Sequence, residues 1–269
     1  MIRNFEKIKK HSNLISIGTM EKKVYVYKYM TFSTALICLK NNTLRFSLPT
    51  TPSWKDPYES RFYCAGYHNL KLGKRDFDRR LFACCVTKNK LSEPAWRMYT
   101  DNPQDHCVKF SICIGQLRKY LNLYAKNHNI SLFEGSIDYS LTDKDINGLH
   151  KKTSCFHNEI FADFQLREYL NLMLLKRHLF IHEGELRYMM LGGDLDFSQD
   201  CVYPYIPWSM CLSKVSLNIQ DDNVESQLRE ALKCNSEECQ LKYSLPYKPF
   251  VPIEIEDIYK PFKKITIEK

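Results

Sequence analysis

The residues best placed to do chemistry in this chain are the charged side chains of the run H-E-G-E-L-R at 182–187, inside an otherwise apolar segment. Side chains two apart on a β-strand point to the same face, so Glu183, Glu185 and Arg187 are expected to project together. Two carboxylates and a guanidinium are costly to remove from water unless they bind something. The E-x-E-x-R run is therefore the first candidate for a site.

A second group of such side chains lies upstream, between residues 27 and 59. It mixes aromatic, basic and acidic residues with prolines, and it comprises Tyr27-Lys28-Tyr29, Phe46-Ser47-Leu48-Pro49 and Trp54-Lys55-Asp56-Pro57-Tyr58-Glu59. This mixture suits stacking on a flat ring while a ribose is hydrogen-bonded. A packed turn, with Asp56 before Pro57, is the plainer interpretation of the last part.

The E-x-E-x-R run also has a purely structural interpretation. An edge strand with one charged face, in which Arg187 neutralises Glu185 or Glu183, would produce the same pattern. A central strand is favoured because the run follows a long apolar segment and continues into apolar residues at 189–191. Charged side chains in a central strand would favour a functional role over a structural one.

Patterns of β-forming and amphipathic residues predict the elements that must position these side chains. Strands are expected over 24–29, 43–48, 81–87, 107–114, 136–140 and around Glu185, and helices over 31–39, 115–126, 158–178 and 222–233. The helix over 31–39 is expected to begin at Thr31 or Ser33 and to close at Asn41-Asn42.

The order of these elements predicts the fold class. Helices interrupted by unevenly spaced strands, without regular βαβ alternation, indicate an α+β fold with mixed or antiparallel sheets and flanking helices. No repeat or low-complexity linker divides the sequence. Residues 1–269 are therefore expected to form one domain, with its core at about 24–250.

Composition limits the class of protein and its partners. The chain has 269 residues, 44% of them hydrophobic and 13% aromatic, and no apolar run approaches the ~18 residues of a membrane-spanning helix. It also lacks a signal-peptide pattern, so a soluble, cytoplasmic protein is expected. The formal net charge of +8 is spread along the chain, which makes nucleic acid or a dinucleotide a more natural ligand than a basic protein.

Cysteine and histidine spacings do not predict a metal site. The eleven cysteines lack C-x-x-C pairs, so they are expected to be reduced, metal-free and buried as small apolar residues. His178 and His182 are four apart but do not form H-E-x-x-H, and Cys155 with His157 is a poor catalytic pair. The nine glycines form neither a Rossmann nor a Walker motif.

Several of these motifs occur together in a family of bacterial domains of unknown function, some associated with phage defence, which the chain resembles. The family pattern is Y-K-Y, L-x-F-S-x-P, N-D-P-F-E, W-x-x-Y and E-x-E-x-R. The matching segments here are Tyr27-Lys28-Tyr29, 44–49, 55–59, 96–99 and 183–187. Lys55 and Tyr58 stand where the family usually has Asn and Phe.

The chain also resembles mono-ADP-ribosyltransferases. Those enzymes have a polar residue on a first strand, a short helix, a second strand with an S-T-S-like segment, and a late E-x-E. The same order is found here in Tyr27-Lys28-Tyr29, the helix over 31–39, the segment 46–51 and Glu183-Gly184-Glu185. The first-strand Arg or His is absent, so Lys28 or a tyrosine would have to replace it.

This second resemblance implies a site that cleaves the nicotinamide–ribose bond of NAD. Glu185 would stabilise the positive charge on the ribose, and Glu183 would orient or deprotonate the acceptor. Lys28 or Arg45 would hold the pyrophosphate. Tyr29 or Trp54 would stack on nicotinamide, and the other residues assigned to the dinucleotide site are Tyr27, Ser47, Asp56 and Arg187.

The leading hypothesis is an NAD-dependent ADP-ribosyltransferase acting as a toxin-like effector of an anti-phage or toxin–antitoxin system. Its basic charge would suit a nucleic-acid acceptor, RNA above all, while a protein acceptor and an antitoxin or chaperone partner stay open. One alternative is a non-catalytic module that binds nucleic acid or a partner. Another is a metal-dependent nuclease in which Asp56, Glu59, Glu183 and Glu185 hold Mg²⁺.

Overall fold

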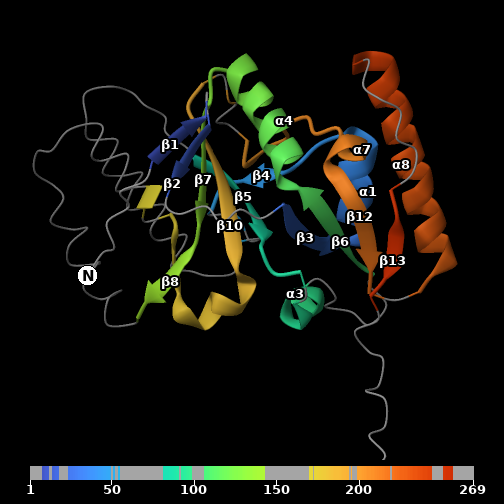
Figure 1. The fold of residues 1–269 in the computed structure, drawn as a ribbon, viewed down its shortest axis with the longest axis horizontal. Helices are drawn as coiled ribbons and strands as arrows, with labels where there is room; N and C mark the ends of the chain where they lie inside the picture. Colours follow the sequence, from blue (N-terminus) through green and yellow to red (C-terminus); the bar gives the residue numbers. More distant parts are fainter. Residues whose placement is uncertain are drawn as a thin grey trace, which may run out of the picture.

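Strands spread along the whole chain build one large mixed sheet, with helices packed against it and a second, two-stranded sheet beside it (Figure 1). The computed structural model describes residues 8–11, 14–17, 24–49, 51, 54, 81–90, 92–98, 106–142, 170–171, 173–193, 195, 199–218, 220–243 and 251–256. The predicted α+β class is confirmed, because helices and a mixed sheet belong to one fold.

The strands in these residues are β1 (Ile8–His11), β2 (Leu14–Ile17), β3 (Tyr25–Thr31), β4 (Phe46–Ser47), β5 (Leu81–Thr87), β6 (Cys107–Cys113), β7 (Ser131–Ser136), β8 (Asp138–Leu141), β9 (Leu175–Arg177), β10 (Glu185–Leu191), β11 (Cys201–Val202), β12 (Leu212–Leu217) and β13 (Ile253–Ile255). The helices are α1 (Phe32–Asn41), α3 (Glu93–Met98), α4 (Ile114–Asn127), α7 (Trp208–Cys211), α8 (Asp222–Tyr243) and the 3-10 helix η1 (His178–Glu183).

The order of strands places β10, which carries Glu185 and Arg187, within the large sheet with neighbours on both sides. The order is β1-β2-β7-β10-β5-β3-β6-β12-β13, with β4 beside β5 and β11 beside β4. β10 pairs antiparallel with both β5 and β7, and every residue of β10 is buried. The central position expected for this strand is confirmed, and its charged side chains are therefore enclosed by protein.

The sheet opens between β3 and β5. These two strands pair at one position, Tyr27 with Thr87, whereas β3 and β6 pair along their full length. Further along the same edge of β5, β4 pairs at Ala83 with Ser47. Cys85 lies between these two pairings, so its backbone carbonyl is not covered by a continuous neighbouring strand. This opening in the sheet provides the space for a pocket.

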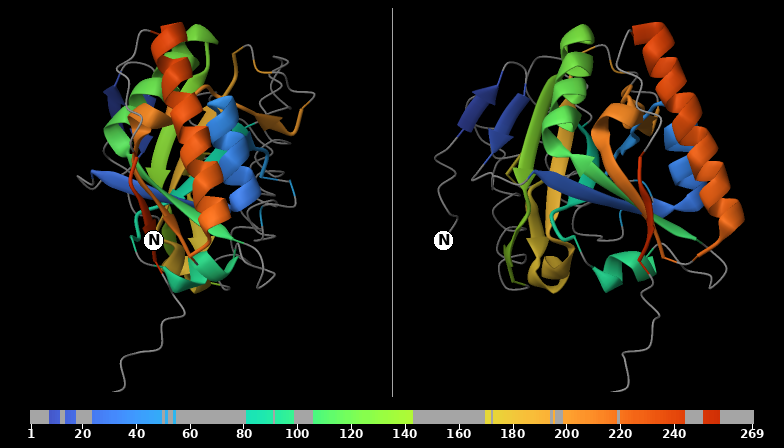
Figure 2. Two further views of the ribbon diagram at one scale, coloured as in Figure 1. Left: turned by 90° about the vertical axis from the view of Figure 1, so that its right-hand side faces the viewer. Right: turned by 45° about the vertical axis from the view of Figure 1, so that its right-hand side comes forward.

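The helices cover the sheet according to their apolar faces. Thr31, one of the two predicted caps, precedes α1, and its hydroxyl accepts a hydrogen bond from the Thr34 amide. Asn42, within the predicted Asn41-Asn42 end, follows the helix in the left-handed conformation. α8 runs alongside α1, and α4 packs on β6 and β7 (Figure 2). α3 and η1 contact each other at one end of the sheet (Figure 1). That end also carries the beginning of β10.

Three predicted elements need correction. The helix expected over 158–178 does not reach its predicted end, because Leu175–Arg177 forms strand β9 and His178 begins η1; residues 158–169 lie outside the described part. The strand expected over 136–140 is replaced by β7 and β8. Of the strand expected over 43–48, only Phe46–Ser47 is formed. In each case pairing with a distant segment decides where the strand or helix ends, and local sequence propensity carries no information about that pairing.

The helix expected over 222–233 continues to Tyr243 and is the longest in the described residues. Asp221 caps it by accepting hydrogen bonds from the Asn223 and Val224 amides. Neither this helix nor any other in the described part of the chain combines the length and the apolar character needed to cross a membrane.

Candidate functional site

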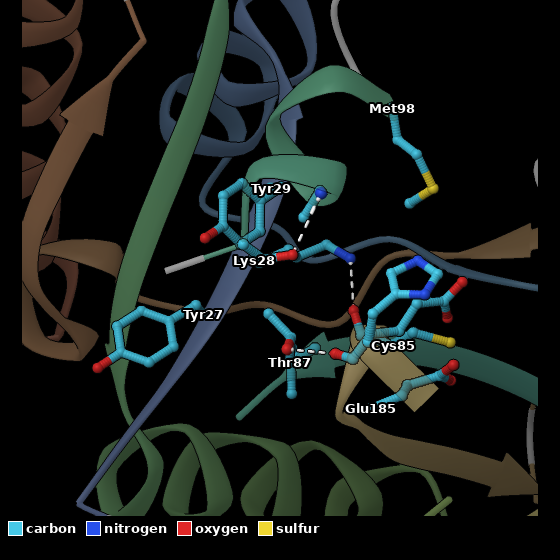
Figure 3. A pocket seen from close by; sticks show the side chains of 12 residues that line it. Tyr27, Lys28, Tyr29, Cys85, Thr87, Met98 and Glu185 are labelled. Atoms are coloured by element: carbon cyan, nitrogen blue, oxygen red, sulfur yellow. Dashed lines mark hydrogen bonds between the residues drawn. The ribbon is translucent and has the colours of Figure 1, made fainter. Parts of the chain in front are cut away.

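A pocket of about 80 Å³ opens where β3 and β5 separate, beside the beginning of β10 (Figure 3). A volume of this size holds roughly five water molecules or one small ring, and is too small for a whole dinucleotide. Its walls come from β3, β5, α3, η1 and β10, through Tyr27, Lys28, Tyr29, Cys85, Val86, Thr87, Ser92, Ala95, Met98, His182, Glu183 and Glu185. Both carboxylates of the E-x-E motif therefore line one pocket with the Y-K-Y segment.

Glu185 is held in the pocket wall by two basic side chains. Its side chain is 5% exposed, and one carboxylate oxygen lies 2.9 Å from Arg187 Nε and 2.8 Å from Arg187 Nη2. The other oxygen lies 3.2 Å from Lys176 Nζ. Arg187 is fully buried, and it also donates to the Met173 carbonyl oxygen. These bonds fix both the position and the ionised form of Glu185.

Glu183 does not lie on the strand, contrary to the expectation from its spacing. It is the last residue of η1, and Gly184 follows with φ 51°, in the left-handed region. β10 begins only at Glu185. The carboxylates nevertheless meet, because Lys176 Nζ lies 2.6 Å from Glu183 Oε2 as well as close to Glu185. The turn at Gly184, rather than the alternation of a strand, brings the two acids together.

The two carboxylates differ in acidity. Burial would raise the pKa of Glu185, but the charges of Arg187 and Lys176 outweigh burial and lower it to about 2. Burial raises the pKa of Glu183, and the neighbouring charge of Glu185 adds to the rise, against the opposing effect of Lys176. One acid is thus kept ionised while the other is made more basic, a division of properties found in pairs of catalytic carboxylates.

Lys28 faces the pair across the opening in the sheet. Its side chain points toward Cys85, and its ammonium lies 3.0 Å from the Cys85 carbonyl oxygen (Figure 3). This bond satisfies the carbonyl that falls between the β3 and β4 pairings. Thr87 lies on the same wall and donates its hydroxyl to the Glu183 carbonyl oxygen. The pocket therefore combines a cation from β3 with anions from η1 and β10.

The tyrosine rings of the Y-K-Y segment lie on the other side of β3, away from Cys85 (Figure 3). The ring of Tyr29 is buried and packs edge-on against Trp96, with ring centres 5.0 Å apart. The ammonium of Lys109 is 5.3 Å from the centre of the Trp96 ring and 5.8 Å from that of Tyr29. This contact with Trp96 leaves the Tyr29 ring packed in the interior rather than open for stacking on nicotinamide.

The remaining residues assigned to the dinucleotide site lie elsewhere. Trp54 donates its indole N–H to Ser47 Oγ at 3.1 Å, and Arg187 stacks over the Trp54 ring at 4.6 Å. Ser47, Trp54 and Arg187 thus form a chain behind Glu185 and are not among the residues that line the pocket.

Arg45 is exposed, and its Nε lies 3.0 Å from Cys201 Sγ. It is not among the lining residues either. Asp56 and Glu59 lie outside the described residues.

Sequence reasoning missed two residues that position the pair. Lys176 falls within the helix expected over 158–178. Tyr139 carries no motif, although its hydroxyl accepts a hydrogen bond of 2.7 Å from the Glu185 amide. Both come from the two-stranded sheet of β8 and β9. A lone lysine seven residues before the acidic pair gave no signal, because β9 is only three residues long.

Metal-binding groups do not gather in the described residues. No cluster of three or more histidine, cysteine, aspartate or glutamate side chains is found there. No disulfide joins the cysteines that the structure describes. The prediction that all eleven cysteines are reduced and metal-free stays a prediction.

Comparison with family models, with curated proteins and with solved structures finds no match for this chain. The geometry of the pocket therefore has to carry the functional conclusion.

Proposed function

We propose that this protein is an NAD-dependent ADP-ribosyltransferase whose reaction centre is the pocket containing Glu183 and Glu185. The observation that supports this most directly is the pair of carboxylates, bridged by Lys176 and opposite in the direction of their pKa shifts. The reaction needs both properties, since it creates a cation and removes a proton.

The steps follow from the chemistry of the bond. The nicotinamide–ribose C–N bond breaks, nicotinamide leaves as a neutral molecule with the electron pair, and positive charge develops on the ribose. Glu185, ionised and fixed, would stabilise that charge. The acceptor then attacks the ribose carbon, and Glu183 would take its proton, because a raised pKa makes a carboxylate a better base.

Lys28 is suited to binding the pyrophosphate. Its ammonium is on the wall opposite the two acids, where it bonds to a backbone carbonyl. Because the pocket has room for about one ring, the rest of the dinucleotide would extend past Lys28 toward solvent. A toxin-like role in defence against phage, with RNA as the favoured acceptor, remains part of the proposal through the family resemblance and the charge of +8.

Glu185→Gln tests the assignment. The substitution keeps the shape of the side chain and removes the charge facing the ribose, so NAD consumption per folded molecule is expected to fall by ~10²–10³. Because Glu185 is buried between Arg187 and Lys176, the melting temperature is expected to fall as well. The rate must therefore be measured at a temperature at which both proteins are folded.

Glu134→Gln provides the matched control. Glu134 is a buried carboxylate on the neighbouring strand β7, where it accepts hydrogen bonds from Ser16 and from Arg118. It does not line the pocket. The Glu134→Gln variant is expected to be less stable than wild type and to consume NAD at the wild-type rate per folded molecule. If Glu185→Gln behaved like this control, the transferase assignment at Glu185 would be wrong.

The same buried ion pairs are the observation that favours the alternative, a non-catalytic binding module with a structural acidic strand. In that case wild-type protein would not consume NAD with any acceptor. A nuclease is less well supported, because Lys176 places a positive charge between the two carboxylates where a divalent cation would bind.

A further inference from the structure

Lys176 connects the pocket to the two-stranded sheet of β8 and β9. It belongs to β9, which pairs in parallel with β8 and not with the large sheet. Its side chain is 8% exposed, and its ammonium is covered by the ring of Phe180 at 4.9 Å. A single buried ammonium thus bonds to two carboxylates on two other elements, η1 and β10.

The two carboxylates depend on Lys176 to different degrees. Glu185 has a second strong partner in Arg187, so its charge remains compensated without Lys176. For Glu183, Lys176 provides both the principal attractive charge and a hydrogen bond, while His182 contributes less. Lys176 therefore has its greatest influence on Glu183.

Several other ionisable groups near the pair come from neighbouring elements in the described part of the chain. They are Cys85 on β5, Lys28 on β3, Tyr139 on β8, His182 on η1 and Arg187 on β10. Of these, Arg187 bonds to Glu185, while Lys28 bonds to the Cys85 carbonyl oxygen. Lys176 bonds to both carboxylates.

From this bridge we infer that Lys176 is a positioning residue, which holds Glu183 at the pocket and sets the pH at which it can accept a proton from the acceptor. The inference rests on the proposed transferase function. Lys176 would bond to the carboxylates and never to the reacting atoms. Its removal would make Glu183 harder to ionise, since burial and the charge of Glu185 would then act without their main opponent.

The test compares Lys176→Met, Lys176→Arg and wild type in NAD consumption per folded molecule from pH 5 to 9. A base works only when it is deprotonated, so activity rises with pH as Glu183 ionises. In Lys176→Met this rise is expected to move to higher pH. Lys176→Arg keeps the positive charge, so its activity is expected to rise at a pH close to that of wild type. A profile for Lys176→Met that is scaled down without moving would overturn the inference.

Two further variants guard against a purely structural explanation. Arg118→Met also leaves a buried carboxylate, Glu134, without its basic partner, and it should lower stability without moving the pH profile. Glu183→Gln removes the titrating group, so activity should fall by ~10²–10⁴ and lose the rise with pH. If Lys176→Met does not fold, an unchanged profile in Glu183→Gln would itself overturn the inference.

Failure of the transferase proposal can be told apart from failure of this one. If wild-type protein consumes no NAD, the proposed function falls, and melting curves then test the bridge alone. The difference in melting temperature between wild type and Lys176→Met should shrink as the pH falls, because protonated carboxylates no longer need the ammonium. A difference that is the same at every pH would show that Lys176 does not control the two acids.

Discussion

At the scale of single residues, the environment of each acid decides its chemistry. Glu183 and Glu185 are two positions apart in sequence, yet one lies at the end of a 3-10 helix and the other begins a buried strand. At Glu185 the charges of Arg187 and Lys176 outweigh the effect of burial, whereas at Glu183 burial outweighs the charge of Lys176. Unequal compensation in a shared pocket separates their pKa values.

Acid sensitivity follows from the pKa of Glu185. It is lowered in the folded protein from its ordinary value of 4.5 to about 2. Its ionised form therefore contributes stability above about pH 4.5, and that contribution is lost as the pH falls toward about 2; it is on the order of 3 kcal/mol. Between pH 7 and pH 3, the melting temperature of wild type should fall more than that of Glu185→Gln. Parallel curves for the two proteins would contradict this prediction.

At the scale of elements, the turn between η1 and β10 is the feature on which the site depends. Gly184 has φ 51°, and its carbonyl oxygen accepts a hydrogen bond from the Lys88 amide on the β5 side. A Cβ atom at this position would lie 2.6 Å from the Asn89 side chain. Asn89 in turn donates to the His182 carbonyl oxygen, so the turn is fixed from both sides.

Gly184→Ala should therefore impair stability and activity together. The left-handed conformation costs a residue with a side chain ~1–2 kcal/mol, and displacement of Asn89 adds to this cost. Gly192→Ala is the matched control, because Gly192 has φ 75° but nothing lies within 4 Å of its added Cβ. Denaturant unfolding should show a larger loss for Gly184→Ala, and only this variant should lose NAD consumption per folded molecule. Equal losses of stability and of NAD consumption in both variants would show that backbone strain alone accounts for the effect of Gly184→Ala, without displacement of Asn89.

At the scale of the whole molecule, the charge bears on the acceptor. A formal net charge of +8 attracts polyanions, and the range of this attraction becomes shorter as salt is added. The pocket itself contains both acids and bases, so under the proposed function this attraction would favour binding of the acceptor and not the chemical step.

Labelled NAD can identify the acceptor. Incubation with cell RNA, DNA and protein as separate fractions should transfer the label mainly to RNA, and the yield should fall steeply as salt rises from about 50 to 200 mM. Glu185→Gln in the same assay serves as the control for non-enzymatic labelling. A label found in protein and insensitive to salt would exclude the nucleic-acid acceptor while leaving the transferase reaction in place.

Much of the framework could be predicted from the sequence. Runs of β-forming residues placed β3, β5 and β6 within one or two residues, because a buried strand needs its apolar side chains in place whatever its neighbours are. The capping candidates Thr31 or Ser33 and Asn41-Asn42 predicted both ends of α1 to within two residues, since capping hydrogen bonds are local. The E-x-E motif is recognisable in the sequence because charged residues in a predicted central strand conflict with their apolar surroundings.

Only the tertiary structure decided how these parts meet. In the tertiary structure Glu183 lies in η1, before β10 begins, and the tyrosine rings point away from Cys85. Lys176 reaches the acidic pair from a second sheet. None of this is encoded by local spacing, because each contact joins elements whose pairing depends on the whole sheet. The sequence by itself determined which residues could react, and the opening between β3 and β5 decided which of them share a pocket.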